Sequence, residues 1–213
     1  MQNTSLSRYS NVNPEVARFI LESGIESPTI LDIGCWTGLL GKYLRERTDC
    51  VVDGVDKVED ALGKAKENGY RNCVKMDLSC ADLHPIEGSY DFIVYADVLE
   101  HTADPGIVFD NFRGNLKQGG RIIISLPNTG FILYRLTHLL GFWNYTAGGV
   151  MDYTHLRVFT LRSMRKFLSS QGTKIIDSIG FNRVRKTFFF LKPLGRWWPG
   201  LLAMQVVFLC ELS

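Results

Sequence analysis

Three aspartates lie at the carboxyl ends of short apolar segments in the first third of the chain. Each segment is expected to form a buried strand. Asp32 lies near the end of Thr29–Ile33, Asp56 follows Cys50–Val55, and Asp77 follows Cys73–Met76. Parallel strands bring their carboxyl ends to one edge of a sheet, which is where such sheets bind ligands. Carboxylates there accept hydrogen bonds from hydroxyl and amino groups. The spacing therefore predicts one polar binding site.

A glycine-bearing turn joins the first strand to an expected helix over Leu39–Arg47. Gly34 and Gly38 can take positive φ and let the backbone approach a ligand closely. A strand, a glycine turn and a helix cradle nucleotide-type cofactors, although such turns also close ordinary strand–helix junctions. The dinucleotide fingerprint needs a middle glycine where this chain has Trp36. The indole therefore argues against NAD or FAD.

The three carboxylates narrow the ligand further. Asp56 lies 24 residues beyond Asp32 (56 − 32), at the distance where an acidic residue accepts ribose hydroxyls. Asp77 is placed to accept from an exocyclic amino group, and Asp32 to attract an amino or cationic group. The set suits a ligand with ribose, adenine and positive charge but no phosphate. The structural alternatives are helix capping by Asp32 or Asp56 and an ordinary turn at Asp77.

S-adenosylmethionine has these parts, and the chain resembles class I S-adenosylmethionine-dependent methyltransferases. The resemblance covers nearly the whole chain, and its motifs are Leu31–Gly38, Gly54–Asp56, Met76–Leu78, Tyr90–Val94, Asp97–His101 and Leu116–Arg121. It implies that the cofactor is held by Asp32, Gly34, Cys35, Trp36, Gly38, Asp56, Lys57, Asp77, Leu78 and Asp97. Trp36 stands at a position where glycine is the commonest residue in the family. We therefore expect altered packing beside the methionine moiety of the cofactor.

The elements that position these residues alternate between strand-like and helix-like patterns, as in a parallel sheet flanked by helices. The expected helices are Pro14–Ser23, Leu39–Arg47, Val58–Asn68, Pro105–Leu116 and Leu161–Gln171. Further strands are expected at Tyr90–Ala96, Arg121–Leu126, Lys174–Ile179 and Gln205–Leu212, the last two as an antiparallel hairpin. The resemblance implies an α/β, Rossmann-like, doubly wound, mostly parallel seven-stranded sheet with an antiparallel last strand. We expect a single domain, 1–213, with an inserted cap at about 129–160 after strand five.

His101 is the first candidate for a general base, because it follows strand four at the same edge and an imidazole accepts protons near neutral pH. The alternative is a histidine that caps the strand or bonds within the adenosyl pocket. His155 is the second candidate. The cap supplies the candidate substrate-binding residues Tyr145, Asp152, Tyr153, His155 and Arg157, with a polar lock between cap and sheet as the alternative. No group has metal-ligand spacing along the sequence, so no metal is predicted.

Composition restricts the partners. The chain has 213 residues, 46% hydrophobic and 22% charged, and a net charge of +2, which gives no reason to expect nucleic acid. Five widely spaced cysteines without a C-x-x-C pair fit a reducing cytoplasm. The segment 181–213 holds five basic groups against one acid, interleaved with aromatic residues. Peripheral membrane binding, a homodimer contact and simple packing are open interpretations of that segment.

A narrower resemblance concerns the acceptor of the methyl group. Asp152–Thr160, preceded by Trp143–Tyr145, resembles a bacterial subgroup often associated with glycan and cell-envelope biosynthesis. We therefore expect methylation of a small molecule, with O-methylation of a sugar or glycan precursor first. A quinone-like or lipid acceptor is the alternative that the aromatic tail favours. Trp36 keeps open a third interpretation, a non-catalytic partner subunit that only binds the cofactor.

Overall fold

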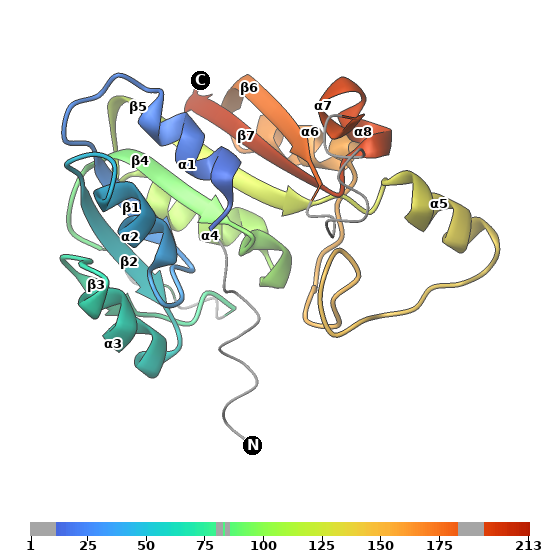
Figure 1. Ribbon diagram of the computed structural model, residues 1–213, viewed down its shortest axis with the longest axis horizontal. Coiled ribbons are helices and arrows are strands. Elements are labelled where there is room, and N and C mark those ends of the chain that lie inside the picture. Colours follow the sequence, from blue (N-terminus) through green and yellow to red (C-terminus); the bar gives the residue numbers. More distant parts are fainter. Residues whose placement is uncertain (1–11, 80–82, 84–85, 183–193) are drawn as a thin grey trace.

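A seven-stranded sheet forms the centre of the molecule, with helices on both faces (Figure 1). The computed structural model describes residues 12–79, 83, 86–182 and 194–213. The strands are β1 (Thr29–Ile33), β2 (Val51–Asp56), β3 (Cys73–Lys75), β4 (Tyr90–Ala96), β5 (Leu116–Pro127), β6 (Thr173–Phe181) and β7 (Gln205–Leu212). Their order is β3-β2-β1-β4-β5-β7-β6, and β7 runs antiparallel to both of its neighbours. The predicted mostly parallel sheet with an antiparallel last strand is confirmed.

Each face of the sheet has its own hydrophobic core. The helices α1 (Pro14–Leu21), α2 (Leu39–Arg45) and α3 (Glu59–Glu67) cover one face, and α4 (Pro105–Arg113) and α6 (Leu161–Ser170) cover the other. Successive residues of a strand point to opposite faces. In β1, Ile30 therefore packs with the first group of helices and Leu31 with the second. Burial on both faces explains why β1 is apolar nearly throughout.

The start of β5 differs from the sequence prediction. A helix was expected over Pro105–Leu116 and a strand from Arg121, but α4 ends at Arg113 and β5 begins at Leu116. Tyr90 of β4 pairs with Leu116, whereas Phe92 pairs with Arg121, so the intervening residues bulge out of the ladder. Gly119 has φ +75° there. The glycine pair thus lies in an irregularity within the strand, where the sequence predicted a turn before it.

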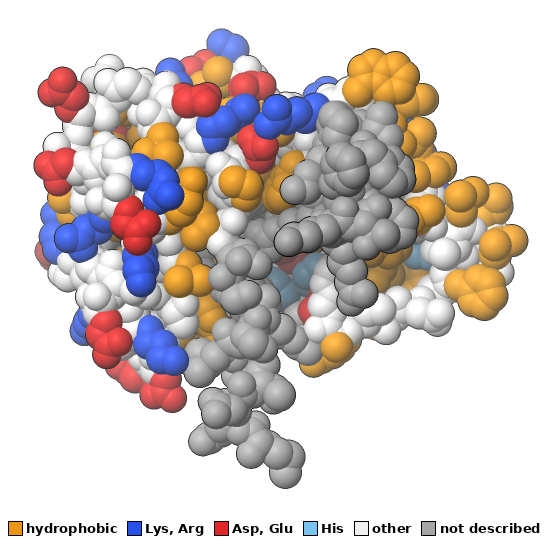
Figure 2. Space-filling model, viewed as in Figure 1, with side chains coloured by type: hydrophobic (Ala, Val, Ile, Leu, Met, Phe, Trp, Pro, Cys, Tyr) orange, Lys and Arg blue, Asp and Glu red, His pale blue; other side chains and the backbone are white. Residues whose placement is uncertain are grey.

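An insertion follows β5 and extends beyond the sheet, beginning with α5 (Ile132–Leu139) (Figure 1). Its two ends meet, because the backbone N–H and the hydroxyl of Thr129 both donate to the carbonyl of Phe159, at 2.8 and 2.9 Å. No residue of α5 is buried. Exposed apolar side chains gather on this side of the molecule (Figure 2), and we call this segment, residues 129–160, the cap.

The remaining helices are short: η1 (Leu99–His101), α7 (Leu194–Trp197) and α8 (Pro199–Leu202). No helix among the described residues is long and apolar enough to cross a membrane. Residues 183–193 of the predicted aromatic and basic segment, with four of its five basic groups, lie outside the described residues. Of the rest, Trp197 and Trp198 are exposed, and Arg196 pairs with Glu15 of α1 at 2.7 Å.

Candidate active site

A cavity of about 450 Å³ opens at the carboxyl edge of the sheet, where the loops after β1, β2, β3 and β4 meet. Its size falls in the range of about 300–1,000 Å³ that is typical of small-molecule sites. We call it the first cavity. Its lining residues are Gly34, Trp36, Asp56, Lys57, Val58, Met76, Asp77, Leu78, Ser79, Ala96, Asp97, Val98, His101, Thr102, Thr154 and Leu156. Seven of the ten predicted cofactor residues are among them.

The glycine turn after β1 is held against two neighbouring strands. Gly34 has φ +74°, and its N–H donates to the carbonyl of Val55 at 2.7 Å. A Cβ on Gly34 would lie 2.6 Å from Cγ2 of Val98. The loop after β4 therefore packs directly on this turn, and only glycine fits both the conformation and the space.

Asp56 ends β2 and orients the wall of the first cavity. Its Oδ2 accepts the backbone N–H of Trp36 at 2.9 Å, and its Oδ1 accepts that of Val58 at 3.0 Å. Trp36 has φ +49°, an uncommon conformation for a bulky residue. The carboxylate thus fixes the glycine turn and the next helix entry together. Each oxygen keeps a second lone pair with which it can bind a ligand.

Asp77 lies beyond β3 and closes a local turn. Its Oδ1 accepts the backbone N–H of Ser79 at 3.0 Å and the Ser79 hydroxyl at 2.7 Å. These bonds, with a smaller contribution from Lys57, hold the pKa of Asp77 below its usual value. The turn and a ligand can both use Asp77, because the two bonds to Ser79 engage Oδ1 and the residue also lines the first cavity. Met76 and Leu78 add apolar wall on either side.

Three predicted cofactor residues lie outside the lining of the first cavity. Asp32 is buried and accepts the hydroxyl of Tyr70 at 2.6 Å. Burial raises the pKa of Asp32 to about 7, the Tyr70 bond opposes this shift, and the charge of Asp56 adds to it. The ring of Tyr70 also packs on Gly38, and Cys35 packs on Gly54 of β2. Their contact with the cofactor stays a prediction, and no sequence pattern marks Tyr70.

Asp97, at the exit of β4, is held by side chains that the sequence did not point to. Its Oδ1 accepts the hydroxyl of Ser125 at 2.7 Å and the side-chain amide of Gln205. Ser125 in turn accepts from Gln205 at 2.8 Å and from Asn13 at 3.1 Å. One topological signal could have found Gln205: it begins an antiparallel strand, and such a strand starts at the carboxyl edge of the others.

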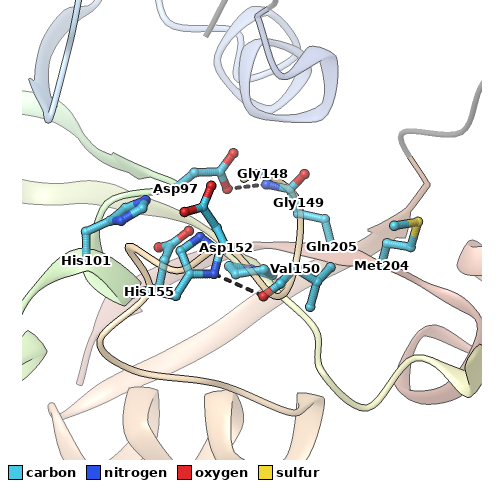
Figure 3. Close-up of a pocket in the computed structure, with 11 residues that line it drawn as sticks. Asp97, His101, Gly148, Gly149, Val150, Asp152, His155, Met204 and Gln205 are labelled. Atoms are coloured by element: carbon cyan, nitrogen blue, oxygen red, sulfur yellow. Dashed lines mark hydrogen bonds between the residues drawn. The ribbon is translucent and has the colours of Figure 1, made fainter. Parts of the chain in front are cut away.

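A second cavity adjoins the first, between η1 and the cap (Figure 3). Its lining residues are Asp97, Glu100, His101, Pro127, Gly148, Gly149, Val150, Asp152, His155, Met204 and Gln205. Asp97 and His101 line both cavities. A reaction between two bound molecules would therefore take place beside these two residues.

The two histidines of the second cavity have defined tautomers. Nδ1 of His101 lies 3.1 Å from the carbonyl oxygen of Thr154. Nδ1 of His155 lies 3.0 Å from the carbonyl oxygen of Val150 (Figure 3). A carbonyl oxygen only accepts, so both Nδ1 atoms donate and both Nε2 atoms keep a lone pair in the neutral ring. The rings meet edge to face at 4.7 Å between centroids. Burial lowers the pKa of His101, and His155 lowers it further.

Glu100 joins the two histidines from η1. Its side chain is buried, and Oε2 has no hydrogen-bond partner in the described part of the chain. Burial raises the pKa of Glu100 well above its usual value, and Asp97 adds to the shift. Its backbone carbonyl accepts the N–H groups of Leu156 and Arg157, at 2.8 and 3.0 Å, which ties the cap to η1.

The candidate substrate residues of the cap separate into two groups. Asp152 and His155 line the second cavity, and Oδ1 of Asp152 accepts the N–H and the hydroxyl of Thr154. Tyr145 and Tyr153 are exposed and line neither cavity. Arg157 donates from Nε and Nη2 to the carbonyl of Ala103, as a polar lock on the loop before α4 would. Eight of the sixteen residues that line the first cavity were not predicted as site residues: Val58, Met76, Ser79, Ala96, Val98, Thr102, Thr154 and Leu156.

Comparison with known proteins identifies the family. Residues 7–178 match the model of a family described as a methyltransferase domain. The chain belongs to this family. A ubiquinone biosynthesis O-methyltransferase of Coxiella burnetii is 25% identical over 177 residues, which are 80% of this chain and 74% of the relative. One of Idiomarina loihiensis is 32% identical over 125 residues, 55% of this chain and 50% of the relative.

Solved structures share the fold of this methyltransferase. Magnesium protoporphyrin IX methyltransferase (ChlM) from Synechocystis PCC 6803, with bound SAH, has a TM-score of 0.63 at 20% identity and covers 94% of this chain and 81% of its own. A possible histamine N-methyltransferase from Thermotoga maritima has a TM-score of 0.65 at 16% identity, with 98% and 94% covered. The methyltransferase uses S-adenosylmethionine as its cofactor. The narrower resemblance to a glycan and cell-envelope subgroup finds no support in these comparisons.

Proposed function

We propose that this enzyme methylates a hydroxyl oxygen on an aromatic ring of the phenol or quinol type, carried by an apolar molecule. The single observation that carries the proposal is His101, which lines both cavities and has Nε2 available as a proton acceptor. The relatives named as ubiquinone biosynthesis O-methyltransferases support a ring of this kind.

The chemistry of the first cavity fits S-adenosylmethionine. Asp56 would accept the ribose hydroxyls, since its bonds to two backbone N–H groups already fix its orientation. Asp77 would accept the adenine amino group through Oδ2, between the apolar side chains of Met76 and Leu78. When bound, the cofactor supplies a methyl group that its sulfonium has already activated. The residues of the chain therefore have to bind and orient the reactants and to manage one proton.

His101 would take that proton from the acceptor hydroxyl at Nε2. The ring is neutral before the reaction because burial lowers its pKa, and its Nδ1–H bond to Thr154 holds the ring in place. The carboxylates of Asp97 and Asp152 favour the protonated ring once the proton has moved. A phenol hydroxyl has a pKa of about 10, as in tyrosine. An aliphatic sugar hydroxyl is a weaker acid, so an imidazole base suits the phenol better.

The cap supports an apolar acceptor. Leu133, Leu136 and Leu139 of α5 are exposed, Leu139 by 82%, and the loop that follows exposes Phe142 and Trp143. Contiguous exposed apolar surface marks binding sites for apolar ligands or membranes. This surface lies on the same insertion as His155. An acceptor whose ring reaches His101 could therefore lay an apolar chain along α5.

A sugar or glycan precursor is the competing acceptor. Asp152 and Gln205 line the second cavity and could bond to sugar hydroxyls. A turnover assay with three acceptors decides between the two. It uses an alkylated hydroxybenzene, the same ring without the alkyl chain, and a nucleotide sugar, and it measures release of S-adenosylhomocysteine.

We expect kcat/KM to be highest for the alkylated ring and at least tenfold lower without the chain, because each buried methylene contributes about 0.8 kcal/mol. A nucleotide sugar that turns over faster than either ring would overturn the proposal. Cofactor binding measured by calorimetry, with no release from any acceptor, would instead favour the non-catalytic interpretation.

A further inference from the structure

We propose that Glu100, His101 and His155 form a binding site for one divalent cation of the zinc type between η1 and the cap. Each residue offers a ligand atom, and the three atoms lie within 4.8 Å of one another. The sequence predicted no metal because residue 155 lies more than fifty positions from the other two. The inference rests on the proposed function only in that the acceptor hydroxyl would react beside this cluster.

The histidines are oriented as metal-bound histidines usually are. A ligating histidine donates its other ring N–H to a carbonyl or carboxylate, which fixes the tautomer and aims the free nitrogen at the ion. His101 and His155 both do so through Nδ1, to the carbonyls of Thr154 and Val150. Both Nε2 atoms are therefore available, and two backbone carbonyls of the cap hold the rings.

Glu100 gives an independent indication that a ligand is missing. Its side chain is only 1% exposed, and Oε2 has no hydrogen-bond partner among the described residues. A buried polar atom without a partner is destabilising, and native structures contain few of them. The backbone of Glu100 is fixed by two N–H groups of the cap, so its side chain is held at the histidines. A cation there would supply the partner.

Two imidazoles and one carboxylate form a ligand set that catalytic zinc sites use, with a further position open for water or a substrate oxygen. Ligands of a tetrahedral zinc ion at about 2.0–2.1 Å lie roughly 3.3 Å apart. The three ligand atoms lie within 4.8 Å of one another, so the side chains need to close by no more than about 1.5 Å to reach this spacing. His155 belongs to the cap, and cation binding would draw the cap toward η1.

A bound cation would change how the acceptor is deprotonated. A hydroxyl that takes the open position has a lowered pKa and releases its proton to water. Nε2 of His101 is then a ligand and no longer a proton acceptor. The cation and the imidazole base are thus two alternative means of deprotonating the acceptor hydroxyl at one site. An experiment can separate them.

The test uses the full chain, freed of metal by dialysis against a chelator and titrated with Co²⁺ alone. We expect one Co²⁺ per chain, with the visible absorption of a four- or five-coordinate ion, and displacement by one equivalent of Zn²⁺. Glu100→Gln and His155→Gln should each weaken Co²⁺ binding at least tenfold. His138→Gln is the matched control, because His138 lies on α5 and stacks on Trp143; its Co²⁺ affinity should equal that of the wild type.

Binding of S-adenosylmethionine, measured by calorimetry, shows that each variant is folded. A wild-type chain without the Co²⁺ absorption, or Glu100→Gln and His138→Gln variants with equal Co²⁺ affinity, would overturn the inference. Turnover of the metal-free enzyme is recorded separately. If the enzyme methylates the aromatic acceptor but does not bind Co²⁺, the cation site is wrong and the proposed function stands. If it binds Co²⁺ but does not methylate that acceptor, the cation site stands and the proposed function is wrong.

Discussion

The loops after β1, β2 and β3 and the cap build two halves of one site in different ways. In the first half, Asp56 and Asp77 already accept backbone N–H groups from residues close to them in sequence or on the neighbouring strand. In the second half, each histidine uses Nδ1 for its bond to a carbonyl of the cap, and Oε2 of Glu100 has no partner among the described residues. His101 and Glu100 are held by backbone groups of the cap more than fifty positions away. Asp56 and Asp77 are thus fixed by bonds within and between neighbouring strand ends, and the acceptor side is assembled by contacts between η1 and the cap.

His101 stands where the halves meet, and replacing it has the largest expected effect. His101→Gln should lower kcat by about 10²–10⁴-fold, the usual contribution of a positioned proton acceptor. The affinity for S-adenosylmethionine should change by less than about threefold, since Asp56 and Asp77 hold the cofactor. Steady-state kinetics and calorimetry measure the two quantities, with His138→Gln as control. A comparable loss of cofactor affinity would place His101 in the cofactor half.

Replacing Asp32 tests whether its carboxyl group is held inside the protein as a neutral acid, bonded to Tyr70. Its pKa is about 7 in the folded state against 3.8 unperturbed. The folded state therefore favours the neutral acid, and stability from this group is full below about pH 4 and is lost as pH rises to about 7. Asp32→Asn removes that loss, which at pH 8 is about 4 kcal/mol, since each pKa unit between 3.8 and 7 corresponds to about 1.4 kcal/mol. Urea unfolding at pH 5 and pH 8 measures it.

The Asn variant should show a smaller fall in the free energy of unfolding between these pH values than the wild type. Asp60→Asn, an exposed position on α3, should behave like the wild type. Equal pH dependence in the Asp32→Asn variant and the wild type would mean that Asp32 ionises normally and is available to a ligand.

Asp56 tests the short-range bonds of the cofactor half. Asp56→Ala should weaken cofactor binding by about 10–100-fold, because charge-assisted hydrogen bonds to hydroxyls are lost and the Trp36 loop loses its anchor. Calorimetry measures the affinity, and Asp60→Ala is the control. An affinity within twofold of the wild type would remove Asp56 from the cofactor site.

Arg157 tests the long-range contacts of the cap and should have the smallest effect. Arg157→Met removes the bonds to the Ala103 carbonyl at an exposed position, where such bonds contribute about 0.5–1 kcal/mol. The KM for the acceptor should rise about two- to fivefold with cofactor affinity unchanged, and Arg162→Met on α6 should alter neither. A change in cofactor affinity alone would show that the polar lock does not act on the acceptor side.

The same difference in range decides what the sequence could predict. β1 and β4 have the predicted bounds, since strands buried on both faces are apolar runs. Asp56 and Asp77 could be assigned to one edge because each follows its own strand. Gly119 was interpreted as part of a turn, although pairing with β4 draws the strand past it, and only a partner strand reveals that.

The parts that escaped prediction join residues far apart in the chain. Tyr70 covers Asp32 from 38 positions away, and Gln205 reaches Asp97 across 108. Glu100 and His155 come together only because the cap folds back on η1. Local sequence patterns do not indicate such contacts. Periodicity and spacing therefore could not show that Glu100, His101 and His155 share one pocket.

The position of β7 between β5 and β6 has a consequence for the order in which the enzyme is made. Gln205, which fastens Asp97, is the first residue of that strand. During synthesis the cofactor loops and both histidines leave the ribosome well before it. A nascent chain can thus form its glycine turn early. Asp97 lacks the hydrogen bond from Gln205 until β7 pairs with β5.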